Sequence, residues 1–179
     1  MLTRDKCGLI VVDVQGSLAL NVHNSDSVLS NIERLIQCCE ILKIPIIWFE
    51  QYPKGLGKTV DSIASLLPNY PRFEKQHFNA LCEPEIEKAM KDSGRTQWLV
   101  TGIEAHICVY QTVRGLLAHR YDVEVVTDAI SSRAEFNVEI AKQKMLQYGA
   151  QHTCVEMAVY ELLEQAGTSE FKSVLPIIK

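Results

Sequence analysis

Short apolar segments rich in β-branched residues alternate along this chain with segments in which apolar residues recur at helical spacing. The first apolar segment, 7–12, has no polar residue at alternate positions, which indicates a strand covered on both faces of a sheet. Strands are predicted at 7–12, 45–49, 72–75, 97–101, 121–126 and 151–155. Strands that alternate with helices predict an α/β fold with a mainly parallel sheet and right-handed crossovers.

Helices are predicted between these strands at 25–43, 59–67, 83–93, 105–119, 136–148 and 156–165. The expected architecture is a three-layer, doubly wound (Rossmann-like) domain: a six-stranded, mainly parallel sheet in the order 3-2-1-4-5-6 with helices on both faces. The 179 residues contain no repeat, low-complexity tract or linker, so residues 1–179 are predicted to form a single domain. The apolar tail that follows Gly167 predicts a docking segment, with a neighbouring subunit as its candidate surface.

The charge balance and the cysteine content limit the classes of partner. Lys and Arg number 18 against 22 Asp and Glu, for a net charge of −4, and no basic block occurs, so neither a nucleic acid nor an anionic membrane is expected. No run approaches the ~18 apolar residues of a membrane span, and the apolar run near the N-terminus is too short for a signal sequence. Six cysteines without an export signal predict a cytoplasmic protein with free thiols. We expect a homo-oligomer, either a dimer, a tetramer or a larger assembly.

Residues 98–112 predict a strand, a turn and a helix that hold a candidate nucleophile. The apolar run ends at Gly102, and helical spacing begins at Ala105, so Cys108 falls in the first helical turn. Unpaired N–H groups and the helix dipole favour an anion there, so the nucleophilic thiolate is expected to be stabilised. The alternative interpretation is a small core residue, since cysteine is among the most buried residue types.

Two further reactive side chains follow predicted strands. Asp13 directly follows the strand at 7–12, where a carboxylate is costly without a partner or a role, although a turn or capping aspartate is the alternative. Lys75 lies between Phe73 and Phe78, so it is either a desolvated lysine that holds a carboxylate or a surface lysine with an apolar stem. Because the first and fourth strands are neighbours at the switch point, Asp13, Lys75 and Cys108 are expected to meet at the ligand-binding edge.

Four segments carry a resemblance to a known family. They are 9–15 (LIVVDVQ), 73–75 (FEK), 101–109 (TGIEAHICV) with Thr112, and 126–133 (VTDAISSR). Their residues and order resemble those of the isochorismatase-like cysteine hydrolases, a family that includes nicotinamidases, carbamoylsarcosine amidohydrolase-like enzymes and isochorismatase-domain proteins. The match spans nearly the whole chain.

The resemblance implies a role for each reactive residue. Asp13 is the implied general base, Lys75 the lysine that organises the charge, and Cys108 the nucleophile. A non-proline cis peptide bond is implied between Ile103 and Glu104, with the backbone N–H groups of Glu104 and Cys108 as the oxyanion hole. Two such donors would stabilise the oxyanion by roughly 3–4 kcal/mol each.

Two departures from the family narrow the expected chemistry. Metal-dependent nicotinamidases carry an Asp-x-His and a further histidine after the second strand, whereas residues 50–55 here read EQYPKG. No metal and no cofactor is therefore expected, and nicotinamide is disfavoured as a substrate. True isochorismatases cleave a vinyl ether and need no cysteine, so Cys108 favours acyl transfer.

The predicted function is hydrolysis of a small amide or a related C–N substrate through a thioester on Cys108. Gln15, Phe78 and His106 are candidate substrate-binding residues, although packing or capping explains each of them equally well. The alternatives are a catalytically silent interaction protein that retains the fold and a thiol redox sensor. A sensor would need a resolving cysteine, for which Cys82 and Cys154 are the candidates.

Overall fold

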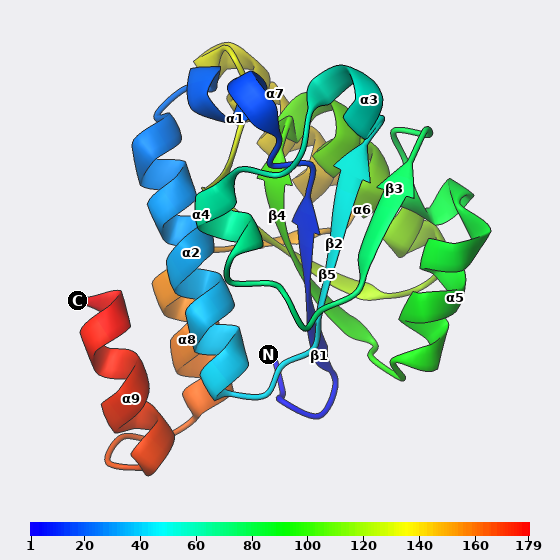
Figure 1. The fold of residues 1–179 in the computed structure, drawn as a ribbon. Helices are drawn as coiled ribbons and strands as arrows, with labels where there is room; N and C mark the ends of the chain where they lie inside the picture. The colour runs from blue at the N-terminus through cyan, green and yellow to red at the C-terminus, as the bar shows by residue number, and fades with distance from the viewer.

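The computed structural model describes residues 1–179 and contains a six-stranded sheet in the order β3-β2-β1-β4-β5-β6 (Figure 1). Every pair of neighbouring strands is parallel. The strands are β1 (Cys7–Val12), β2 (Ile46–Gln51), β3 (Arg72–Lys75), β4 (Gln97–Ile103), β5 (Asp122–Ser131) and β6 (Gln151–Thr153). The predicted fold class and strand order are confirmed.

Helices cover both faces of the sheet, because successive strand residues point to opposite sides. In β1, Leu9 and Val11 belong to one apolar core, and Ile10 and Val12 belong to the other. The first core lies under α1 (Gly16–Asn21), α2 (Ser25–Ile41), α4 (Asp61–Ala64), α8 (Val155–Leu163) and α9 (Ser169–Ile178). The second lies under α5 (Pro84–Asp92), α6 (Tyr110–Ala118) and α7 (Glu135–Gln147). The result is the expected three-layer arrangement, with α2, α8 and α9 together on one side in Figure 1.

Strand β5 is longer than the sequence predicts, because it continues to Ser131, beyond the predicted end at residue 126. The polar side chains in the second half of β5 form hydrogen bonds with neighbouring elements. Thr127 Oγ1 donates to the carbonyl of Thr153 at 2.9 Å, and the Asp128 carboxylate accepts from the N–H of Val155 at 3.0 Å, at the start of α8. Turn-forming residue types therefore remain within a strand, since their hydrogen bonds are made across the sheet.

The expected helix at 105–119 is divided in two. A π-helical turn, η2 (Ala105–Val109), precedes α6, and the N–H groups of Ile107 and Val109 both donate to the carbonyl of Glu104. Three short helical pieces were not predicted, because none is long enough to show a period: α1, α3 (Pro53–Leu56) and the 3₁₀ turn η1 (Ala80–Cys82). Cys108 consequently lies in a widened turn and not in the first turn of a regular α-helix.

Gly102 allows the ends of β1 and β4 to approach each other closely. It pairs with Val12 and has a φ of +117°, a region that disfavours side chains. A Cβ atom built at this position would lie 2.0 Å from the Val12 carbonyl oxygen. The absence of a side chain thus places the residue that follows β1, Asp13, beside the turn that follows β4.

The C-terminal tail docks on its own chain. Helix α9 packs against α2 and α8, and Val174 is 1% exposed within the first core. The Thr168 hydroxyl caps the helix by accepting from the N–H of Phe171 at 3.1 Å. The sequence-based suggestion of a neighbouring subunit as the docking surface is therefore wrong, because the same apolar residues are covered by helices far away in the sequence. None of the helices is both long and apolar enough to cross a membrane.

Replacing Val174 with alanine is expected to lower the free energy of unfolding by about 1–3 kcal/mol, since two buried methyl groups are lost and a cavity is left. The matched control is Lys172→Ala, which truncates an exposed side chain on the same helix. Chemical denaturation with light scattering at each step measures both stability and association. A change in oligomeric state without a change in monomer stability would contradict docking within the chain.

Candidate active site

The carboxyl ends of β1, β3 and β4 bring the three candidate reactive residues to one edge of the sheet, at the top of Figure 1. Asp13 follows β1, Lys75 is the last residue of β3, and Cys108 lies in the turn after β4. Asp13 and Cys108 line a common cavity of about 130 Å³. Lys75 lies behind it, with its ammonium nitrogen 2.7 Å from Asp13 Oδ2.

Lys75 is a buried cation whose hydrogen bonds are all made within the protein. Its side chain is fully buried, and the ammonium donates to Asp13 Oδ2 at 2.7 Å, Gln51 Oε1 at 2.6 Å and the His77 carbonyl at 3.4 Å. The strand register sets this geometry, since Gln51 on β2 pairs with Lys75 on β3. The ammonium therefore fixes one carboxylate oxygen of Asp13 and cannot turn toward a ligand without losing a partner.

The second carboxylate oxygen of Asp13 is buried and has no hydrogen-bond partner. The backbone here has a φ of +50°, a left-handed conformation that aspartate tolerates better than most residues. Burial raises the pKa of the Asp13 carboxyl above its ordinary value of 3.8, and the nearby Lys75 ammonium opposes that rise. An unpartnered oxygen on a carboxylate with a raised pKa is suited to accept a proton from a neighbouring group.

The Cys108 thiol lies beside this carboxylate. Its sulfur is 4.0 Å from Gln51 Oε1, and the residue is 7% exposed. Burial raises the pKa of the Cys108 thiol to about 12, the Asp13 charge adds to the rise, and Lys75 opposes it. The expectation of a stabilised thiolate is therefore wrong for the resting site. Desolvation and the facing carboxylate both favour the protonated thiol, and the turn that holds it is not the start of a regular α-helix.

Glu104 connects the turn after β4 to the segment after β5. The Ile103–Glu104 peptide bond is cis, and the Glu104 backbone N–H donates to no other group of the protein. Its carboxylate Oε1 accepts from the N–H of Arg133 at 3.2 Å and from Arg133 Nε at 3.0 Å. Glu104 thus lines the cavity with a backbone N–H that has no acceptor in the protein, while its side chain is held by the segment after β5.

The three candidate substrate-binding residues lie in different surroundings. Phe78 lines the cavity and is half exposed. His106 does not line it, and its Nδ1 lies 2.9 Å from the Ser132 hydroxyl. Gln15 is fully buried outside the cavity lining. Sequence reasoning missed Gln51, although its position directly at the end of the second strand is the same signal that indicated Asp13.

Gln15 supports the site from behind by extending the pairing between β1 and β2. Its amide oxygen accepts from the N–H of Gln51 at 2.7 Å, and its amide nitrogen donates to the carbonyls of Gln51 at 3.1 Å and Gly57 at 2.7 Å. The side chain therefore bonds both backbone groups of Gln51, as a neighbouring strand would. Gln51 in turn holds the Lys75 ammonium, so Gln15 contributes to the placement of the ion pair.

The variant Gln15→Leu is expected to lower the free energy of unfolding by about 2–3 kcal/mol, because the N–H and carbonyl of Gln51 lose their partners while remaining buried. Gln143→Leu, on the exposed side of α7, is the matched control. Urea denaturation of both variants measures the difference. Equal stability of the two variants would show that the Gln15 amide does not brace Gln51.

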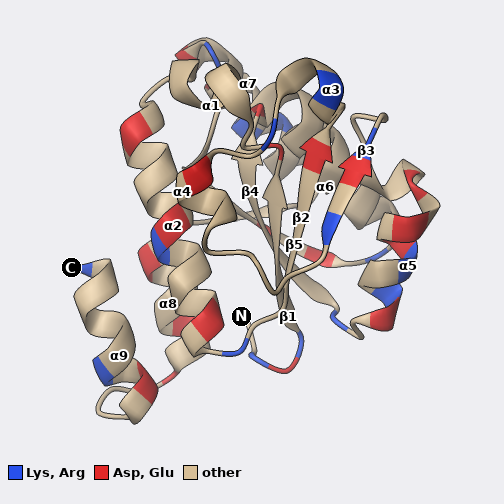
Figure 2. Cartoon of the chain, in the orientation of Figure 1, with Lys and Arg blue, Asp and Glu red and all other residues tan.

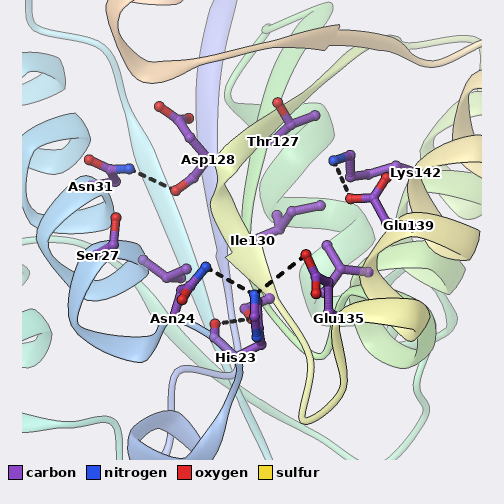
Figure 3. A pocket seen from close by; sticks show the side chains of 13 residues that line it. His23, Asn24, Ser27, Asn31, Thr127, Asp128, Ile130, Glu135, Glu139 and Lys142 are labelled. Atoms are coloured by element: carbon purple, nitrogen blue, oxygen red, sulfur yellow. Dashed lines mark hydrogen bonds and ion pairs between the residues drawn. The ribbon is translucent and has the colours of Figure 1, made fainter.

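A roomier cavity lies elsewhere, between α2, β5 and α7 (Figure 3). It has a volume of about 260 Å³ and a mainly polar lining, which includes His23, Asp128 and Glu135. Its side chains are engaged with their surroundings; for example, Asn31 Nδ2 donates to the Asp128 carbonyl at 2.8 Å. It contains no cysteine, so the smaller cavity, which holds the thiol, the carboxylate and an available N–H, is the candidate active site.

The remaining cysteines and acidic residues add no second reactive cluster. All six cysteines are unpaired, and neither the exposed Cys82 nor the half-buried Cys154 lines the Cys108 cavity. The structure contains no group of three or more His, Cys, Asp or Glu side chains placed to hold a metal ion.

A doubly wound parallel sheet with an Asp–Lys ion pair and a cysteine at its carboxyl edge defines a Rossmann-like domain with a candidate nucleophile. The chain belongs to the isochorismatase domain family, whose model matches residues 7–157. Isochorismatase family protein 1B of Dictyostelium discoideum is 33% identical over 175 residues, which cover 96% of this chain and 85% of that protein. The secreted isochorismatase effector Isc1 of Phytophthora sojae is 36% identical over 176 residues, which cover 96% of this chain and 83% of the effector.

Solved structures share the fold along the whole chain. The MAR1 ribonuclease of Caenorhabditis elegans has a TM-score of 0.93 and 36% identity, with coverage of 99% of this chain and 91% of that chain. The YcaC gene product of Escherichia coli, described as an octameric hydrolase of unknown specificity, has a TM-score of 0.92. At 23% identity, with coverage of 98% of this chain and 89% of that chain, the YcaC likeness is one of fold.

Proposed function

We propose that this protein is a cysteine hydrolase that cleaves a small amide or a related C–N substrate with Asp13, Lys75 and Cys108. The observation that carries the proposal is the unpartnered oxygen of Asp13 in the cavity that holds Cys108, with Lys75 bonded to the other oxygen. Membership of the isochorismatase family supports hydrolase chemistry in general. The specific roles are proposed from the positions of the Asp13 carboxylate, the Lys75 ammonium and the Cys108 thiol.

The first half of the reaction forms a thioester. Asp13 accepts the thiol proton as Cys108 Sγ attacks the substrate carbonyl carbon, which places negative charge on the carbonyl oxygen. The backbone N–H groups of Glu104 and Cys108 stabilise that charge, an effect of roughly 3–4 kcal/mol per donor. The C–N bond then breaks, and the departing nitrogen takes the proton from Asp13, which leaves the acyl group on sulfur.

The second half restores the enzyme. Water gives a proton to Asp13 and attacks the thioester carbonyl carbon, the C–S bond breaks, and the sulfur takes that proton back from Asp13 as the carboxylic acid leaves. Lys75 keeps the Asp13 carboxylate in place through both proton transfers. A thiol that rests protonated fits this sequence, because the proton leaves only when the substrate is attacked.

Ammonia release and an acyl mass on Cys108 test the proposal together. We expect wild-type protein quenched in acid during turnover of propanamide to carry one acyl group on the Cys108 peptide, and Cys108→Ala to release no ammonia. Cys82→Ala, an exposed cysteine outside the cavity, is the matched control and should retain turnover. Ammonia release that persists in Cys108→Ala would exclude a thioester at this residue.

The alternatives from the sequence receive less support. A thiol redox sensor needs a resolving cysteine near Cys108, and neither candidate lines its cavity. A silent interaction protein has no need of a buried ion pair aimed at a thiol. An unpaired buried charge is costly. In a protein that had lost catalysis, mutation would therefore be expected to remove Asp13 and Lys75 together.

We further propose a cytoplasmic homo-oligomer that does not bind nucleic acid. Six unpaired cysteines suit a reducing compartment. Phe136 and Ile140 expose apolar surface on one face of α7, and the Escherichia coli relative is described as octameric. Figure 2 shows basic and acidic positions together on α5 and α9, and the net charge is −4, which disfavours phosphate-backbone binding even though a relative is described as a ribonuclease.

A further inference from the structure

We infer that the active site takes a small, uncharged primary amide with a short aliphatic acyl group. This inference rests on the proposed function and names the substrate class of the same site. It follows from which polar groups around the cavity are already engaged and which remain available. The wall chemistry and the cavity size then limit the rest of the substrate.

The charged and polar side chains at the cavity are nearly all engaged within the protein. Lys75 has three oxygen partners, and the Gln51 amide is used at both ends, by Lys75 and by the Gln76 carbonyl at 2.7 Å. The Glu104 carboxylate is paired with Arg133 at 3.0 Å. A charged substrate would therefore find no available counter-ion at the reacting end of the cavity.

Two polar groups remain available beside the thiol, in addition to the Cys108 backbone N–H proposed for the oxyanion. Asp13 Oδ1 has no partner and can accept one N–H, and the Glu104 backbone N–H has no acceptor and can donate to one oxygen. A primary amide supplies one carbonyl oxygen and one N–H on the same carbon, which matches this pair. A second polar group elsewhere on the substrate would have no complement and would be desolvated without compensation.

The rest of the cavity is an aliphatic and aromatic wall. Its apolar members are Leu18, Leu56, Phe78, Ile103 and Ile107. The volume of about 130 Å³ corresponds to about four water molecules at ~30 Å³ each, well below the range for drug-sized ligands. Leu56 and Phe78 are 39% and 51% exposed, so the wall continues to the surface and a chain of a few carbons can lie along it.

A homologous series of amides tests the acyl preference. We expect kcat/KM to rise about fourfold per added methylene from acetamide through propanamide to butanamide, because each buried CH₂ adds to binding. Glycinamide carries a positive charge and succinamate a negative one. For each of them we expect a kcat/KM at least about 100-fold lower than that of butanamide. Hydrolysis of either charged amide as fast as that of butanamide would overturn the inference while leaving the hydrolase proposal intact.

Protection of Cys108 from alkylation gives a readout that does not depend on turnover. Iodoacetamide labelling of Cys108, followed by peptide mass spectrometry with the exposed Cys82 as internal reference, is measured with each amide present. We expect butanamide to protect at a lower concentration than acetamide, glycinamide or succinamate. If no amide is hydrolysed but butanamide still protects best, the hydrolase proposal fails and the ligand class stands; equal protection by all four, or none, overturns the ligand class.

Phe78→Ala shows whether the wall sets the preference. The variant is expected to reduce the ratio of butanamide to acetamide kcat/KM by about fivefold or more, because the acyl chain loses its aromatic contact. Phe136→Ala, which removes a phenylalanine that is 74% exposed on α7, is the matched control and should leave the ratio unchanged. An unchanged ratio in Phe78→Ala would show that this wall does not select the acyl group.

Discussion

Asp13→Asn is expected to lower kcat/KM for a small amide by about 100- to 10,000-fold, the range observed when a positioned general base is removed. Asparagine has the shape of the aspartate and can still bond Lys75, but it cannot accept the thiol proton. The loss should appear in kcat as well as in kcat/KM, because the carboxylate acts in both halves of the proposed reaction. Initial rates with butanamide, measured on protein shown to be folded by circular dichroism, provide the test.

The pH profile distinguishes loss of a base from loss of structure. In the wild type, activity should fall on the acid side as Asp13 becomes protonated, with a midpoint above 3.8 because burial raises the pKa of that carboxyl. In Asp13→Asn, attack depends on direct ionisation of Cys108, so the residual rate should rise about tenfold per pH unit through neutral pH. Removal of the Asp13 charge also lowers the pKa of the Cys108 thiol from about 12, since that charge contributes to the rise.

Asp128→Asn is the matched control. Asp128 is a half-buried aspartate whose pKa is also raised by burial, but it caps α8 and lies at the cavity of Figure 3. It should alter stability and leave the pH profile of the reaction unchanged. Parallel profiles for wild type and Asp13→Asn would mean that another group accepts the thiol proton.

The strand pattern could be predicted because burial on both faces leaves a strong signal. The limits of β1 agree with the prediction, and β2 and β4 differ by at most two residues at either end. The extension of β5 through polar residues could not be predicted, since it depends on acceptors and donors on β6 and α8. Tertiary hydrogen bonds there outweigh local turn preference.

The candidate active site likewise has features that the sequence predicts and features that depend on tertiary contacts. Placement of Asp13, Lys75 and Cys108 at one edge follows from strand order and strand ends, which the sequence indicates. The roles of Gln15 and Gln51 depend on side-chain amides that bond backbone and ammonium across the sheet, which no spacing rule predicts. The protonation of Cys108 also could not be predicted, because the π-helical turn and the facing carboxylate are properties of the folded site.

Lys75→Met is expected to lower the free energy of unfolding by about 3–5 kcal/mol at pH 8, because removal of one member of a buried ion pair leaves the other charge without a partner. Methionine fills a similar volume, so the loss reports the charge more than the packing. Lys91→Met, which removes an exposed lysine paired with Glu87 on α5, is the matched control and should change stability little. Chemical denaturation of both variants gives the comparison.

The difference in free energy of unfolding between wild type and Lys75→Met should become smaller as the pH falls. Burial already raises the pKa of Asp13, and loss of the Lys75 charge raises it further, so the folded variant binds a proton more readily than the unfolded chain. Stability then increases as the pH falls below the folded-state pKa toward the pKa of the unfolded chain, and this gain is lost as the pH rises through the folded-state pKa. Denaturation at pH 5 and pH 8 should therefore show a smaller gap from wild type at pH 5.

The double variant Asp13→Asn with Lys75→Met separates charge from geometry. With both charges removed, neither side chain carries an uncompensated charge, so much of the stability lost in Lys75→Met should return while amide hydrolysis stays at or below the residual rate of Asp13→Asn. Recovery of stability without recovery of activity would show that the two charges are coupled in the fold and that the reaction needs them in addition. If the double variant is as unstable as the sum of the two single variants, the two charges are not coupled, and Lys75 cannot be the group that holds Asp13 ready to accept the Cys108 proton.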